Sequence, residues 1–123
     1  MKYSVTKRFT FEAAHHLPYH KGLCQRVHGH GFKLEITVSN THLQDTGSDK
    51  GMVIDFRNLS QLVSIWILSC LDHEDLNKLF ENPTAEEMSV WIYETIKVRL
   101  PRDITLEKVK LWETEDNSVE ITE

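Results

Sequence analysis

The chain has 123 residues and a formal net charge of −5 with histidine neutral. This length suits a single domain, residues 1–123, with a modest core, and the acidic balance argues against binding to nucleic acid. Two cysteines do not make a disulfide framework, and residues 1–8 lack the apolar core of a signal peptide. The longest apolar stretch, residues 62–71, is far shorter than the roughly 20 residues of a membrane span. We therefore expect a cytoplasmic protein that does not enter a membrane.

The first 40 residues predict a pair of strands. Residues 3–15 alternate between polar side chains and a mainly apolar set, which is typical of a half-buried strand. Residues 28–38 show the same alternation. The loop around residues 18–26 would join the two strands into an antiparallel pair.

Three of the seven histidines lie on the apolar sides of these strands, namely His15, His28 and His30. His16 points the other way, provided that no β-bulge intervenes. His28 and His30 are two residues apart on one strand, so their Cα atoms lie about 6.5 to 7 Å apart and both rings point to one side. Three imidazoles on an apolar face would each need a separate partner, so a shared metal ion explains them better. Nitrogen ligands favour zinc over calcium or magnesium, and leave iron and manganese open.

The rest of the chain predicts two helices followed by two strands. Asp55 can cap a first helix, and Thr84 begins a capping-box sequence that opens a second. Residues 104–113 and 119–122 are the further strands. The expected inward residues are Phe56, Leu59, Leu62, Val63, Trp66, Ile67 and Cys70 in the first helix, and Met88, Trp91, Ile92 and Ile96 in the second. This order predicts an α+β fold in which both helices can cover one face of a sheet.

The two cysteines have different surroundings. Cys24 lies four residues before His28, and sites of mixed cysteine and histidine are common for zinc, so it is a candidate fourth ligand. Lys21 and Arg26 make the same loop electropositive, which lowers the pKa of a thiol and favours a reactive role. The residues alone leave both roles open. Cys70, on an apolar helix face, is predicted to be inert core.

Two acidic positions are further candidates. Asp72 and His73 follow the first helix, and most such pairs are surface pairs. A carboxylate beside an imidazole can instead raise its pKa and prepare a general acid. Glu113 ends a strand with inward parity. Its carboxylate either frays into solvent, which the residues alone favour, or accepts hydrogen bonds from a bound ligand.

Six motifs occur in one order along nearly the whole chain: Phe11-Glu12-Ala13-Ala14-His15, Cys24-x-x-x-His28-Gly29-His30, Gly51-Met52-Val53-Ile54-Asp55-Phe56, Leu71-Asp72-His73, Asn82-Pro83-Thr84-Ala85-Glu86 and Trp112-Glu113-Thr114. In these motifs the chain resembles the 6-pyruvoyltetrahydropterin synthase family. The three-residue gap between Cys24 and His28 is similar to its bacterial branch, the 6-carboxytetrahydropterin synthases of the queuosine pathway. His16 differs from the arginine often found there, and the turn at 115–117 matches no family pattern.

The resemblance implies the tunnelling fold, in which a four-stranded antiparallel sheet carries two helices on one face. Three subunits close their sheets into a barrel, and two trimers stack into a homohexamer. It also implies a role for each candidate residue: His15, His28 and His30 as ligands of Zn²⁺, Cys24 as the catalytic thiol, Asp72 and His73 as a proton relay, and Glu113 as the carboxylate that grips the pterin ring.

The implied substrate is 7,8-dihydroneopterin triphosphate. The implied product is 6-carboxy-5,6,7,8-tetrahydropterin, with release of triphosphate and acetaldehyde. Lys21, Arg26 and Lys33 are the candidates for holding the triphosphate. Two alternatives stay open: a triphosphate lyase that releases 6-pyruvoyltetrahydropterin, and a non-catalytic, zinc-stabilised binding module in which Cys24 would be a ligand.

Overall fold

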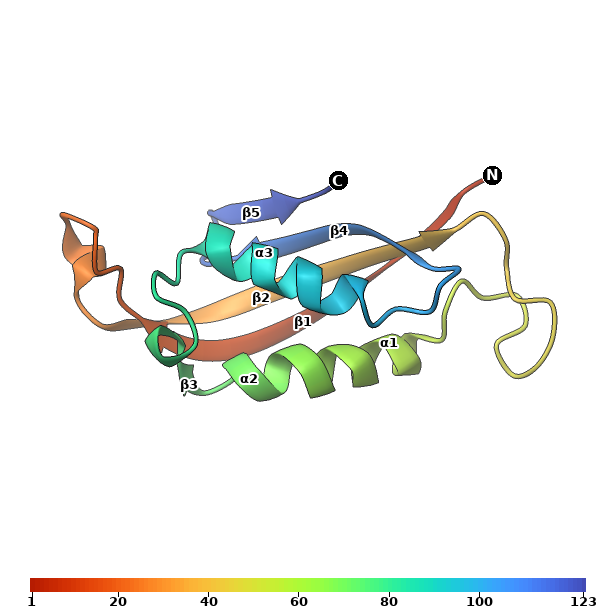
Figure 1. Cartoon of the computed structure of the whole chain (residues 1–123), viewed down its shortest axis with the longest axis horizontal. Helices are drawn as coiled ribbons and strands as arrows, with labels where there is room; N and C mark the ends of the chain where they lie inside the picture. The colour runs from red at the N-terminus through yellow and green to blue at the C-terminus, as the bar shows by residue number, and fades with distance from the viewer.

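One curved, five-stranded sheet runs through the computed structural model, which describes residues 1–123 (Figure 1). The strand order is β3-β1-β2-β4-β5. β1 (Tyr3–His15) and β2 (His28–Asn40) form a long antiparallel pair. β4 (Thr105–Trp112) pairs with β2, and β5 (Ser118–Ile121) pairs with β4, both antiparallel. The four expected strands are therefore confirmed, with bounds that differ by two residues at most.

The expected number of strands was wrong by one. β3 (Glu74–Asp75) pairs in parallel with Ala13 and Ala14, at the outer edge of β1. The backbone N–H of His73 donates to the carbonyl of Glu12 at 2.5 Å and brings the chain to this edge. Two residues are too few for an alternation to appear in the sequence, so this strand could not be predicted from a pattern.

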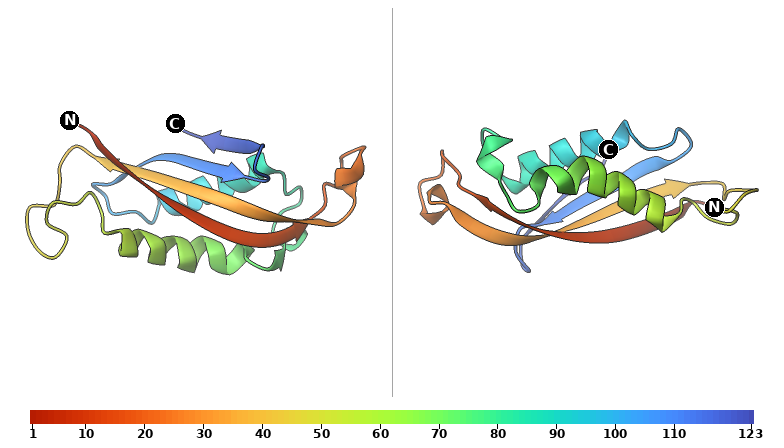
Figure 2. Two further views of the ribbon diagram at one scale, coloured as in Figure 1. Left: turned by 180° about the vertical axis from the view of Figure 1, so that it is seen from behind. Right: turned by 90° about the horizontal axis from the view of Figure 1, so that it is seen from below.

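Both helical segments lie on one face of the sheet, as expected (Figure 2). The first runs from α1 (Phe56–Val63) through a π-helical turn, η2 (Ser64–Leu68), into α2 (Ser69–Leu71). The second is α3 (Ala85–Lys97). None of these helices has the length and apolar character that crossing a membrane requires.

The two predicted helix caps are present. The carboxylate of Asp55 accepts a hydrogen bond from the backbone N–H of Arg57 at 2.7 Å. The hydroxyl of Thr84 accepts one from the backbone N–H of Glu87 at 3.1 Å. Each bond satisfies an N–H group that the first turn of a helix otherwise leaves unpaired. The Thr84 cap fixes the start of α3, and with it the position of the segment just before the helix.

The predicted inward face of the first helix is correct only in part. Its fully buried residues recur every four positions: Leu59, Val63, Ile67 and Leu71. Phe56, Trp66 and Cys70 were expected inside but are exposed. A π-helical turn holds more residues than an α-helical turn, so it rotates the positions that follow. In a regular α-helix Cys70 would face the sheet, whereas here Leu71 takes that place and Cys70 turns outward.

The hydrophobic core lies between the sheet and the two helical segments. From the sheet it includes Phe11, Phe32 and Leu34, and from α3 it includes Met88 and Ile92, all buried. The rings of Phe11 and Phe32 stack with their centroids 4.9 Å apart. Next to Phe32 the core ends against a group of histidines at the end of β1 and the start of β2. Apolar packing therefore supports one side of the candidate site.

Candidate metal centre

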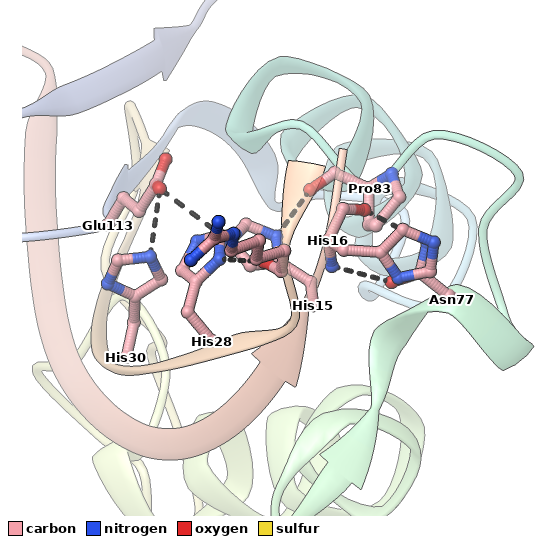
Figure 3. Close-up of polar contacts among 8 residues, drawn as sticks. His15, His16, His28, His30, Asn77, Pro83 and Glu113 are labelled. Atoms are coloured by element: carbon pink, nitrogen blue, oxygen red, sulfur yellow. Dashed lines mark hydrogen bonds and ion pairs between the residues drawn. The ribbon is translucent and has the colours of Figure 1, made fainter. Parts of the chain in front are cut away.

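Strand register brings three histidines together at one end of the sheet. β1 and β2 pair without interruption, with His15 opposite His28 and Ala13 opposite His30. Because side chains alternate along a strand, all three imidazoles emerge on the face that the helices cover. Their ring centroids lie between 4.6 and 5.1 Å apart (Figure 3). The grouping expected from alternation is confirmed, while the role of these residues as metal ligands stays a prediction.

Backbone carbonyls orient two of the three rings. His15 Nδ1 lies 2.8 Å from the carbonyl oxygen of Pro83, and His28 Nδ1 lies 2.7 Å from that of Arg26. A carbonyl only accepts, so both Nδ1 atoms carry the proton and donate. Nε2 of His15 is then left with a free lone pair, and it is buried without a hydrogen-bond partner, as is Nε2 of His30. Buried polar atoms are seldom left unpaired, and an imidazole oriented through its other nitrogen is typical of metal ligands.

Glu113 reaches the same point from the end of β4 (Figure 3). Its Oε1 lies 3.1 Å from His30 Nε2 and 3.6 Å from His15 Nε2, and its side chain is only 25% exposed. The backbone N–H of Glu113 donates to the carbonyl of Asn117 at 3.0 Å and holds the strand end in a closed turn. The structure thus excludes the solvent-facing alternative for this carboxylate.

Together these residues fit a metal ion. One ligand atom from each of His15, His28, His30 and Glu113 can be chosen so that all four lie within 4.8 Å of one another. Ligand atoms in a tetrahedral zinc site, with bonds of about 2.0 to 2.1 Å, lie roughly 3.3 to 3.4 Å apart. Small side-chain adjustments would therefore close the four atoms around one ion. Imidazole nitrogen and carboxylate oxygen are both ordinary zinc ligands.

Burial keeps the buried imidazoles in the form that binds metals. Desolvation is the largest influence on the pKa of His15 and lowers it, although the hydrogen bond to Pro83 and the charge of Glu113 act in the opposite direction. Desolvation also lowers the pKa of His30, again against the charge of Glu113. Both rings are therefore neutral at neutral pH, and neutral imidazole is the ligand form of histidine.

Asp72 and His73 form a pair at the outer edge of β1, next to Glu12. Oδ1 of Asp72 lies 3.0 Å from His73 Nδ1 and accepts a hydrogen bond from the backbone N–H of Glu12, also at 3.0 Å. The Glu12 bond is the largest cause that holds the pKa of Asp72 below its usual value, and contact with His73 adds to it. His73 adopts φ of +60°, which residues other than glycine adopt uncommonly. His73 and His30 line the same cavity of about 490 Å³.

Cys24 lies outside the cluster of ligand atoms. It sits in a short 3-10 helix, η1 (Leu23–Gln25), within the loop that projects beyond the ends of β1 and β2 (Figure 1). The backbone N–H of Leu17 donates to the Cys24 carbonyl at 2.7 Å, and the residue is half-buried. Glu113, not Cys24, stands beside the three imidazoles, which favours the reactive-thiol role. That role stays a prediction.

Sequence reasoning missed several groups that shape this region. Asn77, in η3 (Leu76–Lys78), holds the backbone of His16 through two hydrogen bonds, accepting from its N–H at 2.9 Å and donating to its carbonyl at 3.0 Å (Figure 3). This fixes the chain directly after His15. The Pro83 and Arg26 carbonyls were missed because every residue has one, so a sequence gives no sign of which carbonyl will orient a ring.

Comparison with known proteins places the chain in a family. The family model for 6-pyruvoyl tetrahydropterin synthase matches residues 4–123. The chain belongs to this family. The 6-carboxy-5,6,7,8-tetrahydropterin synthase of Synechocystis sp. is 43% identical over 91 residues, which cover 72% of this chain and 70% of that protein. The dihydroneopterin monophosphate aldolase of Pyrococcus furiosus is 36% identical over 121 residues, which cover 98% of each.

Members of the 6-pyruvoyl tetrahydropterin synthase family share this fold in solved structures. The Caenorhabditis elegans 6-pyruvoyl tetrahydropterin synthase superimposes with a TM-score of 0.81, over 100% of this chain and 96% of that one. The two sequences are 23% identical, so this likeness shows the fold alone. The resemblance and the α+β fold expected from the sequence are therefore confirmed.

Proposed function

We propose that the protein is a zinc-dependent lyase that converts 7,8-dihydroneopterin triphosphate to 6-carboxy-5,6,7,8-tetrahydropterin, with release of triphosphate and acetaldehyde, in queuosine biosynthesis. The observation that carries the proposal is the cluster of three imidazoles and one carboxylate, in which two buried ring nitrogens have no hydrogen-bond partner. Membership of the family and the name of the Synechocystis relative support the pterin substrate.

His15, His28 and His30 are the residues that would hold the metal. A bound Zn²⁺ supplies positive charge that lowers the pKa of a substrate hydroxyl and orients it. The chain prepares this site before any ion arrives, because the carbonyls of Pro83 and Arg26 fix two of the rings with Nε2 directed into the cluster. Burial against Phe32 keeps bulk water away from the inner side.

Cys24 and the Asp72–His73 pair are the proposed proton carriers. Cys24, as a thiolate, would remove a proton from the substrate side chain. Asp72 stays ionised because the Glu12 N–H stabilises its charge, and its contact with His73 Nδ1 favours a proton on that nitrogen. Nε2 of His73 is then the atom that accepts or delivers a proton. His73 lines a cavity together with Glu12, Ala14, Gly29 and Gly31, whose positions alternate along β1 and β2 with those of the three clustered histidines.

Glu113 is the proposed anchor for the pterin edge. A carboxylate accepts two parallel N–H bonds, which fits the adjacent donors of a pterin ring. Glu113 also lines a second cavity of about 210 Å³, together with Ala85 and Glu86 at the start of α3 and with Ser118 in β5. Glu113 therefore borders both the histidine cluster and a space at the start of α3. This position supports a role in which it holds a substrate next to the cluster.

The assembly and the phosphate site are also proposals. The sheet face opposite the helices carries no second layer in one chain (Figure 2), which is consistent with the trimeric barrel and the homohexamer of the tunnelling fold. Lys21, Arg26 and Lys33 remain the candidates for the triphosphate. Lys21 and Arg26 lie in the β1–β2 connection, whereas Lys33 lies within β2, opposite Thr10 and Trp112. A cytoplasmic location remains the expectation.

A second function has its own support. The match to the Pyrococcus furiosus dihydroneopterin monophosphate aldolase spans nearly the whole of both chains at 36% identity. An aldolase acting on a dihydroneopterin monophosphate would cleave a carbon–carbon bond of the same side chain. It would use the same kinds of group, a metal and a general base. The phosphorylation state of the substrate separates the two activities.

One experiment distinguishes these functions. Purified, zinc-loaded protein is incubated with 7,8-dihydroneopterin triphosphate and, separately, with the monophosphate, and the products are identified by mass spectrometry. We expect 6-carboxytetrahydropterin and acetaldehyde from the triphosphate. Release of 6-pyruvoyltetrahydropterin would replace the proposal with the pyruvoyl synthase, and cleavage of the monophosphate alone would replace it with the aldolase. If neither substrate is converted, the remaining interpretation is the non-catalytic, zinc-stabilised binding module.

A further inference from the structure

The Glu113 carboxylate occupies the place of a fourth ligand. Its Oε1 lies 3.1 Å from His30 Nε2 and 3.6 Å from His15 Nε2. These two distances bracket the separation of roughly 3.3 to 3.4 Å that two ligand atoms have in a tetrahedral zinc site. A catalytic zinc usually has three protein ligands and one open position. Here a protein carboxylate stands where that open position would be.

A hydrogen bond does not account for this approach. Neither His15 Nε2 nor His30 Nε2 has a hydrogen-bond partner, although the Glu113 oxygen is close to both. His15 donates its Nδ1 proton to Pro83, so a neutral ring has only a lone pair on Nε2. A lone pair facing a carboxylate oxygen is a repulsive contact. A cation between the two atoms would make the same arrangement favourable.

The backbone around Glu113 is held independently of its side chain. The N–H of Glu113 donates to the Asn117 carbonyl at 3.0 Å, and the indole N–H of Trp112 donates to Glu35 at 3.3 Å. Glu113 also lines the cavity of about 210 Å³. Rotation about side-chain bonds alone can therefore carry the carboxylate from the cluster toward this cavity.

We propose that Glu113 binds the metal ion in the substrate-free protein and leaves it when a pterin is seated, so that a coordination position opens only then. The first half, metal ligation, stands on the geometry alone. The second half, exchange to the pterin, rests on the proposed function. Such an exchange would protect the metal from other anions until the substrate arrives. One carboxylate would then both close the resting site and recognise the ring.

The ligation half is tested by metal affinity, without any turnover. Zinc dissociation constants of the full chain are measured by competition with a chromophoric chelator, and the visible spectrum of the Co²⁺-loaded protein is recorded. Loss of groups outside the ligand set already weakens metal binding by about 10- to 100-fold, so Glu113→Gln and Glu113→Ala should each cost at least about tenfold. The Co²⁺ bands should also change. Circular dichroism checks that both variants are folded.

Glu115→Gln is the matched control, because it removes the same charge from the same turn at an exposed position. We expect it to leave the zinc affinity and the Co²⁺ spectrum unchanged. Equal affinities and spectra for wild type and both Glu113 variants would overturn the proposal. An equal loss in Glu115→Gln would also overturn it, because the effect would then come from general charge and not from a ligand.

The exchange half is tested with neopterin as the probe. Adding neopterin to the Co²⁺-loaded wild type should shift the bands toward those of ligand-free Glu113→Ala, because the carboxylate leaves the ion. Neopterin that binds, as judged by its fluorescence, without altering the bands would overturn the exchange. Product formation is measured separately. If the wild type makes the carboxypterin but the Glu113 variants keep full zinc affinity, this inference is overturned and the proposed function stands. If the Glu113 variants lose zinc affinity but the wild type makes no carboxypterin, the ligation stands and the proposed function is overturned.

Discussion

His15 and His73 each face an oxygen atom through Nδ1, yet one is sealed inside the protein and the other lies in solvent. The His15 side chain is 1% exposed, and its partner is a neutral backbone carbonyl. The His73 side chain is 78% exposed, and its partner is the carboxylate of Asp72. A ring that must stay neutral needs burial, whereas a ring that exchanges protons needs access and a partner for its charged form. The two surroundings suit a ligand and a proton carrier.

The largest expected effect is on zinc content, which should depend on the clustered histidines and not on His73. Wild-type protein should bind about one zinc per chain, the stoichiometry of a single three-histidine site. His28→Ala should lose most of this zinc, because two imidazoles remain and one oriented ring is gone. His73→Ala, the matched control, should keep it. Elemental analysis by mass spectrometry measures both. Wild-type protein without stoichiometric transition metal would remove the site.

The next effect concerns the proposed proton carriers, whose substitution should lower turnover without lowering the zinc content. Cys24→Ala should lower turnover by at least ~10², the low end for general acid–base catalysis, while keeping its zinc. His73→Asn should behave in the same way. Turnover is followed by chromatography of the pterin product, and zinc is measured on the same samples. Loss of zinc in Cys24→Ala would instead favour the closed structural site with a cysteine ligand.

A third prediction tests Glu113 from the substrate side. A charge-assisted hydrogen bond contributes about 1.5 to 3 kcal/mol, so Glu113→Gln should weaken binding of a pterin ligand by roughly 10- to 150-fold. Fluorescence titration with neopterin, at zinc concentrations that saturate both proteins, measures this without interference from a changed metal affinity. A dissociation constant equal to that of wild type would remove Glu113 from the pterin site.

The smallest expected effect is on the free energy of unfolding and concerns His73, the exposed histidine of the two. His73 has φ of +60°, a conformation that costs most residues roughly 1 kcal/mol and costs asparagine or glycine less. His73→Asn should therefore raise the free energy of unfolding by up to about 1 kcal/mol, as measured by urea denaturation of the zinc-loaded protein. His42→Asn, at an exposed loop position without this backbone conformation, is the control. A destabilised His73→Asn would show that the contact with Asp72 outweighs the strain.

Much of the histidine cluster was predictable, because it depends on periodicity. Alternation placed His15, His28 and His30 on one side of two strands, and an uninterrupted β1–β2 register preserved that alternation in the structure. The only register shift in the sheet lies between Thr37 and Val38, toward the other end of β2. Local chemistry likewise predicted both helix caps. These features depend on neighbours in sequence or on one pairing partner.

The remainder depends on contacts that no local pattern encodes. The π-helical turn rotated Cys70 out of the core, and nothing in the spacing of apolar residues indicated where such a turn would form. The strand Glu74–Asp75 was too short to show alternation. The inward parity of Glu113 was visible, but its position against the imidazoles depends on where β4 ends and on the turn that closes at Asn117.

The most direct test of the central claim follows one preparation through removal and return of its metal. Product formation from 7,8-dihydroneopterin triphosphate is measured on the protein as purified, after chelation and dialysis, and after one equivalent of Zn²⁺ is added back. If the histidine cluster is the metal centre on which pterin conversion depends, product should form, then disappear, then return with the zinc. Product formation that continues unchanged in protein shown by elemental analysis to be free of metal would contradict the account.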